Sequence, residues 1–319
     1  MKSIELKSYG KINLTLDVKG LLDNGFHEVE MIMQQILLCD DISMKWEPAS
    51  GDEAKEDSLK ISLSTNRKYL PTDEKNLAYK AALVMWDYCR ENNMPVEPGK
   101  LTIYIKKRIP VAAGLAGGSG NGGAVLHGLN VLWNLGMDVA GLCEIGKQLG
   151  SDVPFCIMGQ AAENENLKER FAEDPLACHC ALASGTGTEL KPLEGLKSHL
   201  ILSKPAISVS TAAAYKGIDS MEIPQHPDTE EMIAALCTKS RTLVTKNLIN
   251  VLENYTLKEY PIVVYTKNKI QNMLGSDAVL MSGSGPTVFG LCESRQQAQS
   301  ICEEMKKENR ESFWTRTTY

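Results

Sequence analysis

The chain has 319 residues, of which 43% are hydrophobic and 23% charged, with a formal net charge of −6. That length and apolar content suit two domains of ordinary size, and the negative charge excludes a basic field for nucleic acid or anionic lipid. No apolar run is long enough to span a bilayer, and the first residues lack the apolar core of a signal peptide. Nine cysteines, an odd number, indicate reduced thiols, so we expect a soluble, cytoplasmic two-domain α/β protein. Cys178-His179-Cys180 has no second ligand pair at zinc-like spacing, so no metal site is expected there.

In the first half of the chain, alternating apolar and polar residues predict β-strands. The predicted strands cover residues 3–8, 11–18, 28–38, 42–46 and 101–105. Asn24-Gly25 is a strong turn signal between two of these strands and favours a hairpin. Apolar residues at helical spacing predict a helix over 75–91.

A glycine-rich loop runs from Pro110 to Gly123, ahead of a predicted helix over 124–135. Glycines let backbone amides approach a ligand, and the helix adds unpaired N–H groups and the positive end of its dipole. This combination predicts an anion site, usually for phosphate; the alternative is a flexible connecting loop. Another helix is predicted over 139–149, and Pro154 places Asp152 on a loop just past that helix.

Residues 160–180 are polar and charge-laced, so we expect a surface excursion that belongs to neither core. Beyond it, strands interleave with helices, which is typical of an α+β sandwich. Strands are predicted over 199–203, 278–281, 287–291 and 313–318, and helices over 229–237, 243–253, 267–273 and 294–307. The predicted domains are 1–159 and 181–319, with 160–180 as an insertion.

Two glycine patterns need separate interpretation. Residues 118–123 spell G-x-G-x-x-G, but in a dinucleotide-binding fold the first glycine follows the strand directly, whereas residues 108–116 intervene here. The sequence contains no G-x-x-x-x-G-K-[ST], which excludes a P-loop. A second glycine turn, 281–288, would alone indicate a hairpin, but two such turns in separate domains favour a cleft lined from both sides.

Three polar residues are ambiguous when each is taken alone. Lys11 is ordinarily a solvated lysine, His27 an exposed turn residue and Asp152 a turn or helix-end aspartate. A phosphoryl-transfer enzyme, however, needs a carboxylate that aligns or deprotonates the accepting hydroxyl, and a cation that stabilises charge. Both interpretations remain open at this level.

Together, several segments resemble the GHMP kinase superfamily. They are residues 9–14 (Tyr-Gly-Lys-Ile-Asn-Leu), 23–28 (Asp-Asn-Gly-Phe-His-Glu), 107–119 with its Pro-x-x-x-Gly-Leu centre, 149–155 and 281–289. The resemblance implies an α+β two-domain architecture. Residues 1–159 would form a nucleotide-binding, ribosomal-protein-S5-domain-2-like domain, and residues 181–319 a ferredoxin-like α/β sandwich that contributes to the substrate pocket.

The resemblance also implies roles for particular residues. Lys11 and Asp152 would form the catalytic pair, and Asn13, Phe26, His27, Thr211 and Tyr215 would bind the substrate. The ATP phosphates would lie against Pro110, Gly114, Leu115, Ala116, Gly117, Gly118, Ser119, Gly120 and Asn121, with Mg²⁺ arriving with ATP. The segments are most similar to superfamily members that phosphorylate a cytidine-diphosphate sugar alcohol for isoprenoid synthesis by the non-mevalonate route. Such a protein would be a monomer or homodimer that binds neither nucleic acid nor membrane.

The chain departs from the superfamily pattern in two places. The loop usually continues with Ser-Ser-Asn/Asp-Ala-Ala, whereas this chain has Ser119-Gly-Asn-Gly-Gly123, and residues 160–180 precede the expected strand at 182–187. Two alternatives follow: a GHMP kinase for another small alcohol, which His27 and Tyr215 disfavour, and a catalytically weakened nucleotide-binding homologue, which Lys11 and Asp152 disfavour.

Overall fold

The structure is a computed structural model that describes residues 1–51 and 57–319. Alternation of apolar and polar residues gives long strands, and glycine, proline and asparagine end most of them. In chain order the elements are β1 (Lys2–Leu21), β2 (His27–Pro48), β3 (Leu59–Thr65), α1 (Leu77–Glu91), β4 (Gly99–Lys106), α2 (Gly117–Leu132), α3 (Val139–Lys147), α4 (Val153–Glu163), β5 (Cys180–Ser184), β6 (Glu189–Pro192), β7 (His199–Lys204), α5 (Thr211–Ile218), α6 (Thr229–Cys237), α7 (Arg241–Lys246), β8 (Ile249–Asn250), α8 (Glu253–Glu259), α9 (Pro261–Leu274), β9 (Val279–Met281), β10 (Val288–Cys292), α10 (Arg295–Met305) and β11 (Glu311–Arg316). None of the helices in the described ranges combines the length and apolar character that crossing a membrane requires.

The chain forms two compact units, each of which takes residues from several segments. Unit 1 comprises Met1–Tyr9, Cys39–Ile109 and Ala116–Cys178, and unit 2 comprises Gly10–Leu38, Pro110–Leu115 and His179–Tyr319. β1 and β2 therefore contribute residues to both units. The predicted domain bounds, which follow chain order, differ from these units chiefly at 10–38 and 110–115, and they stay a prediction.

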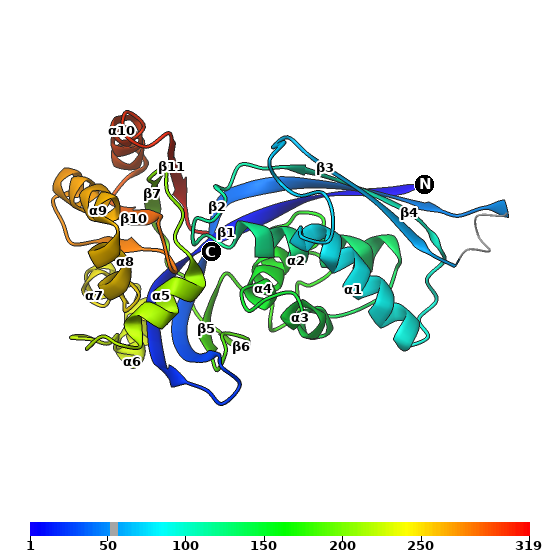
Figure 1. The fold of residues 1–319 in the computed structure, drawn as a ribbon, viewed down its shortest axis with the longest axis horizontal. Coiled ribbons are helices and arrows are strands. Elements are labelled where there is room, and N and C mark those ends of the chain that lie inside the picture. The colour runs from blue at the N-terminus through cyan, green and yellow to red at the C-terminus, as the bar shows by residue number, and fades with distance from the viewer. Residues whose placement is uncertain (52–56) are drawn as a thin grey trace. The chain divides into compact units, whose positions relative to one another are not determined.

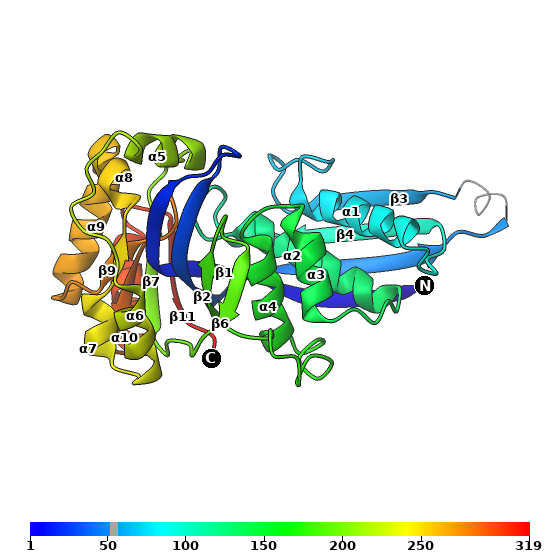
Figure 2. The same cartoon turned by 90° about the horizontal axis from the view of Figure 1, so that it is seen from below.

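In unit 1 a sheet carries helices on one of its faces. The strand order is β3-β4-β2-β1, with β3 parallel to β4 and β2 antiparallel to β4, so that Asp41 lies opposite Lys106. α1, α2, α3 and α4 all lie on the same side of this sheet (Figures 1 and 2). α2 is buried along almost its whole length, because its residues are small or apolar on every side.

Unit 2 contains the remaining strands in two sheets. β8 pairs with β1, and β5 pairs with β2 and β6, in the same seven-stranded sheet that contains β3 and β4, whereas β11, β7, β10 and β9 form a separate antiparallel sheet in that order. α9 and α10 pack against the second sheet, as Figure 1 shows for the orange and red helices. The predicted α+β sandwich in this part of the chain is confirmed.

The helix predicted over 243–253 is wrong. α7 ends at Lys246, and the chain is extended as β8 before α8 begins. Asn250 donates from Nδ2 to the carbonyl oxygens of Met281 and Gly283, both at 2.8 Å, while β8 pairs with β1. The pairing of β8 with β1 requires an extended backbone, and together with the Asn250 hydrogen bonds it outweighs the local helical spacing.

The prediction that residues 160–180 belong to neither core is also wrong. α4 continues through residue 163, and the 164–178 segment that follows buries Leu167 and Phe171. The ring of Phe171 lies 5.4 Å from that of His127 in α2, measured between centroids. The segment is polar by composition, but its few apolar side chains face inward.

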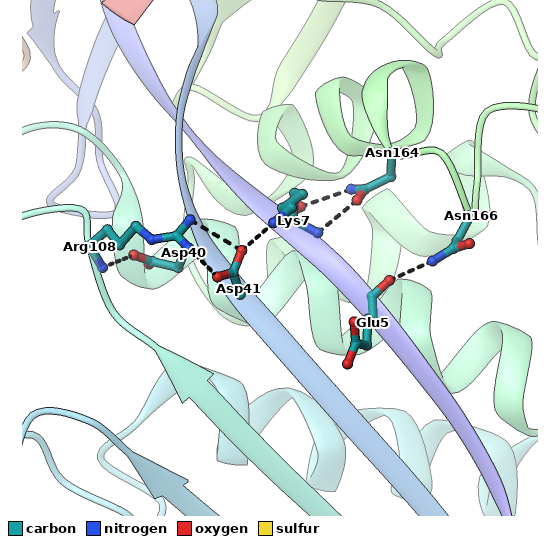
Figure 3. Close-up of polar contacts among 7 residues, drawn as sticks. All are labelled: Glu5, Lys7, Asp40, Asp41, Arg108, Asn164 and Asn166. Atoms are coloured by element: carbon teal, nitrogen blue, oxygen red, sulfur yellow. Dashed lines mark hydrogen bonds and ion pairs between the residues drawn. The ribbon is translucent and has the colours of Figure 1, made fainter. Parts of the chain in front are cut away.

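The 164–178 segment also completes the edge of the unit 1 sheet (Figure 3). The Asn164 side chain pairs with both backbone groups of Lys7: Lys7 N–H donates to Oδ1 at 2.7 Å, and Nδ2 donates to the carbonyl oxygen at 2.8 Å. Asn166 Nδ2 donates to the carbonyl oxygen of Glu5 at 2.7 Å. β8 pairs with β1 only at Thr15 and Leu16, so near Lys7 the two amides satisfy strand groups that another chain could otherwise pair with.

Candidate functional site

The glycine-rich loop leads into α2 earlier than predicted, at Gly117 rather than at residue 124. The N-cap residue, Ala116, has a φ of 54° and a side chain that cannot cap the helix. The N-cap side chain therefore supplies no acceptor to the amides of the first turn, which lie at the positive end of a long helix. This geometry suits the predicted phosphate site, with Gly118 exposed and Ser119 half-buried on the first turn.

A buried lysine lies beside this first turn, and sequence reasoning missed it. Lys107 is only 5% exposed, and a Cβ added to Gly117 would lie 2.7 Å from its Nζ. Lys107 Nζ donates to Asp40 Oδ2 at 2.5 Å, and Asp40 Oδ1 accepts from the backbone N–H groups of Arg108 (2.7 Å) and Ile109 (2.8 Å). Burial lowers the pKa of Lys107, while Asp40 opposes that shift. The only sequence signal was a lysine directly after a strand, which is too common to single out.

One glycine that departs from the superfamily pattern, Gly120, has a packing reason. A Cβ on Gly120 would lie 2.7 Å from Ser8 Oγ and 3.0 Å from the carbonyl oxygen of Tyr9. Gln160 Nε2 donates to the carbonyl oxygen of Gly120 at 2.8 Å. Asn121, with its amide nitrogen facing Ser8 Oγ at 2.8 Å and Asp40 Oδ2 at 2.9 Å, joins the same network. Gly120 thus lets α2 approach β1 more closely than a larger residue could.

Asp152 lies in unit 1, immediately before α4, as predicted from Pro154. It occupies the N-cap position with φ −78° and ψ −13°, and its carboxylate makes no capping hydrogen bond within the described part of the chain. The Asp152 carboxylate therefore does not cap α4, although an aspartate at the N-cap position usually caps its helix.

Lys11 is not the solvated lysine that the first alternative required. It is 4% exposed, its Nζ donates to Asn13 Oδ1 at 2.8 Å, and its backbone N–H donates to the carbonyl oxygen of Leu115 at 3.1 Å. Asn13 in turn donates from Nδ2 to Met31 Sδ at 3.2 Å. In unit 2 the structure therefore brings together Lys11, Asn13 and the predicted loop residue Leu115.

The second glycine turn is more than a hairpin, because it packs on the first glycine loop. Gly114 has a φ of 72°, and a Cβ there would lie 2.1 Å from the carbonyl oxygen of Ser282. Ser282 Oγ donates to the carbonyl oxygen of Gly114 at 2.9 Å. Gly283 is also close, since its Cβ would lie 3.7 Å from Asn13 Oδ1. Only glycine fits at 114, for both its conformation and its neighbours.

Four of the predicted substrate residues, Phe26, His27, Thr211 and Tyr215, lie at α5 and at the β1–β2 turn of unit 2, whereas Asn13 lies within β1. The rings of His27 and Tyr215 lie 5.0 Å apart at 39°, and His27 Nε2 lies 2.8 Å from Asp219 Oδ1. Thr211 Oγ1 lies 3.0 Å from Ser284 Oγ in the second glycine turn. Phe26 is 66% exposed at the tip of the turn. Of the remaining predicted residues, Asp152 and 116–121 belong to unit 1 and Pro110 belongs to unit 2.

Two family profiles match the chain. One, described as GHMP kinases N terminal domain, matches residues 76–160, and the other, described as GHMP kinases C terminal, matches residues 232–311. The first covers the glycine loop and α2, and the second covers most of the helices and strands around the second glycine turn. The class of protein defined by fold and site is thus that of the GHMP kinases, which confirms the predicted architecture.

Similar proteins narrow the class. A protein of Alkaliphilus metalliredigens, 43% identical over 96% of this chain and 93% of its own length, and one of Acetivibrio thermocellus, 40% identical over 99% and 100%, are both named 4-diphosphocytidyl-2-C-methyl-D-erythritol kinase. A crystal structure of 4-(cytidine 5'-diphospho)-2C-methyl-D-erythritol kinase matches with a TM-score of 0.74 and 26% identity, covering 99% of this chain and 100% of that one. Homoserine kinase from Cytophaga hutchinsonii shares the fold, with a TM-score of 0.68 and 19% identity over 100% of this chain and 95% of that one. The chain belongs to the 4-diphosphocytidyl-2-C-methyl-D-erythritol kinase family of GHMP kinases.

Proposed function

We propose that this protein transfers the γ-phosphoryl group of ATP to the 2-hydroxyl of 4-diphosphocytidyl-2-C-methyl-D-erythritol, in the non-mevalonate route to isoprenoid precursors. The observation that carries the proposal is the 43% identity to a relative of that name over nearly the full length of both chains. Membership of a kinase family implies ATP as the phosphate donor. A cytoplasmic location and a monomeric or homodimeric state belong to the same proposal.

In this mechanism the first turn of α2 holds the ATP phosphates. The amides after Ala116, which the N-cap side chain does not cap, support that role, since they and the positive end of the helix favour an anion. Mg²⁺ would arrive on the phosphates, with the half-buried Ser119 hydroxyl as the protein group on that turn that fits it. When bound, Mg²⁺ would neutralise negative charge on the phosphoryl group that is transferred.

Lys11 and Asp152 take the catalytic roles. Asp152 would align the accepting 2-hydroxyl and receive its proton, and Lys11 would stabilise the negative charge of the transferring phosphoryl group. Two features support these assignments: Asp152 does not cap α4, and Lys11 is buried and oriented by Asn13. Asn13, Phe26, His27, Thr211 and Tyr215 would hold the substrate, with the aromatic rings stacking on its cytosine.

The direct test measures ADP release from ATP with 4-diphosphocytidyl-2-C-methyl-D-erythritol, and identifies the product by ³¹P NMR. Homoserine and mevalonate serve as control acceptors, because proteins that share the fold are named for them. We expect turnover with the cytidylyl substrate and a new phosphomonoester signal. Turnover restricted to a control acceptor, or ATP binding without transfer to any of the three, would refute the proposal.

A further inference from the structure

Two side chains from α5 and its C-cap, Tyr215 and Asp219, contact the imidazole of His27. Tyr215 and Asp219 stand four residues apart, at α5 and its C-cap, so they project from the same side of the helix. Tyr215 supplies a ring 5.0 Å away, and Asp219 supplies a carboxylate oxygen 2.8 Å from Nε2. The His27 side chain is 13% exposed and the Asp219 side chain 43%.

The packing of α5 fixes the positions of Tyr215 and Asp219 relative to His27. A Cβ on Gly217 would lie 2.0 Å from Cδ2 of Tyr255 in α8, so only glycine allows the two helices to approach this closely. Ser210 caps the start of α5 by accepting from the N–H of Ala213 at 3.3 Å. Tyr215 and Asp219 therefore meet His27 in a geometry that the packing of α5 determines.

The carboxylate decides which ring nitrogen carries the proton. An ionised carboxylate can only accept, so Nε2 of His27 must donate to Asp219 Oδ1. In a neutral imidazole the other nitrogen, Nδ1, is then a hydrogen-bond acceptor. Cytosine and uracil differ at the group that such an acceptor would read: C4 carries an amine donor in cytosine and a carbonyl acceptor in uracil.

We propose that Asp219 is a positioning residue that fixes the Nε2–H tautomer of His27, so that Nδ1 accepts from the cytosine amine and rejects uracil. This inference rests on the proposed function, in that a cytidine diphosphate group is the part of the substrate that His27 meets. Asp219 acts through His27, whose Nε2 lies 2.8 Å from its Oδ1. An acceptor facing the C4 carbonyl of uracil leaves two lone pairs opposed, which costs binding free energy.

The first experiment reads the tautomer without any catalysis. The ¹⁵N shifts of His27, recorded above about pH 8 where an ordinary imidazole is neutral, distinguish a protonated Nε2 from a protonated Nδ1. We expect a single Nε2–H form in the wild type and a mixture in Asp219→Asn, because an amide can donate as well as accept. Asp219→Glu should restore the single form. Glu222→Gln, an exposed carboxylate in the same connection, is the matched control. A mixture in the wild type would overturn the proposal.

The second experiment measures selectivity with CDP and UDP as competing ligands, so it does not depend on turnover. We expect the wild type to prefer CDP by about tenfold or more, and Asp219→Asn to lose most of that preference, with ATP binding unchanged. An equal preference in Asp219→Asn and wild type would refute the role of Asp219. If CDP is preferred but 4-diphosphocytidyl-2-C-methyl-D-erythritol is not phosphorylated, the proposed function fails while the tautomer assignment survives.

Discussion

Asp152 is the residue whose chemistry the proposed reaction depends on most directly. Its carboxylate is half-buried and does not cap α4, so replacing it should leave the helix intact. We expect Asp152→Asn to lower kcat by about a hundredfold or more with little change in either KM, because the carboxylate acts in the transition state. Steady-state kinetics check this, with Asp87→Asn, an exposed carboxylate on α1, as the control. A rate within about threefold of wild type would end the catalytic assignment.

His127 makes stability depend on pH. It is fully buried, its Nε2 donates to the carbonyl oxygen of Ile157 at 2.9 Å, and burial lowers its pKa from 6.5 to about 4. His127 takes up a proton at a higher pH in the unfolded chain than in the folded protein. The contribution of neutral His127 to folding stability is therefore complete above its pKa in the unfolded chain, and it is lost as the pH falls toward its pKa in the folded protein. From about pH 7 to about pH 5 the wild type should lose about 2 kcal/mol more than His127→Gln, measured by urea unfolding. Parallel losses in the two proteins would contradict the assignment.

The helix α2 offers a matched pair of glycine substitutions. A Cβ on Gly122 would make ordinary contacts with Leu77 and Leu149 at 3.4–3.7 Å, whereas one on Gly120 would clash with Ser8 and Tyr9. Gly122→Ala should therefore stabilise the protein by about 1 kcal/mol through helix propensity. Gly120→Ala should destabilise it by about 1–3 kcal/mol through overpacking. Thermal unfolding of both variants checks the pair, and stabilisation by Gly120→Ala would show that α2 does not lie this close to β1.

The 164–178 segment should behave as part of the unit 1 core. Phe171 is buried against His127, so Phe171→Ala should cost about 3–5 kcal/mol in the free energy of unfolding. Asn166→Ala is the control, because it removes a single exposed hydrogen bond to Glu5 (Figure 3) and should cost about 1 kcal/mol or less. Similar small losses in both variants would support the original interpretation of a surface excursion.

At the scale of the whole molecule, the proposed ligand sites are spread over segments far apart in the chain. AMP-PNP should slow amide hydrogen exchange in peptides covering 110–121, and CDP should do so in peptides covering 26–27 and 211–219, because ligand binding suppresses local opening. Adding Mg²⁺ should strengthen the protection by AMP-PNP but not that by CDP. If AMP-PNP but not CDP protected peptides covering 211–219, the assignment of this segment to the cytidylyl substrate would be wrong, and the segment would belong to the ATP site.

The local sequence determined those features that depend on residues close together in the chain. Asn24-Gly25 set the turn between β1 and β2, Pro154 placed Asp152 ahead of a helix, and the glycines after Pro110 set an uncapped helix start. The superfamily, and with it the two-domain α+β architecture, followed from motifs that are each only a few residues long. The roles of the site residues stay predictions.

Only the tertiary structure decided which side chains would meet across long separations in sequence. Asp40 holds Lys107 beside Gly117, Asn250 keeps β8 extended, and Asp219 reaches His27, although nothing near these residues in the chain signals a partner. The same holds for Asn164: its local sequence indicates only a loop, but its side-chain amide forms hydrogen bonds with the backbone N–H and carbonyl groups of Lys7. Local spacing fixes propensity and turn geometry, whereas burial and hydrogen bonding between distant segments depend on packing that no short window of sequence contains.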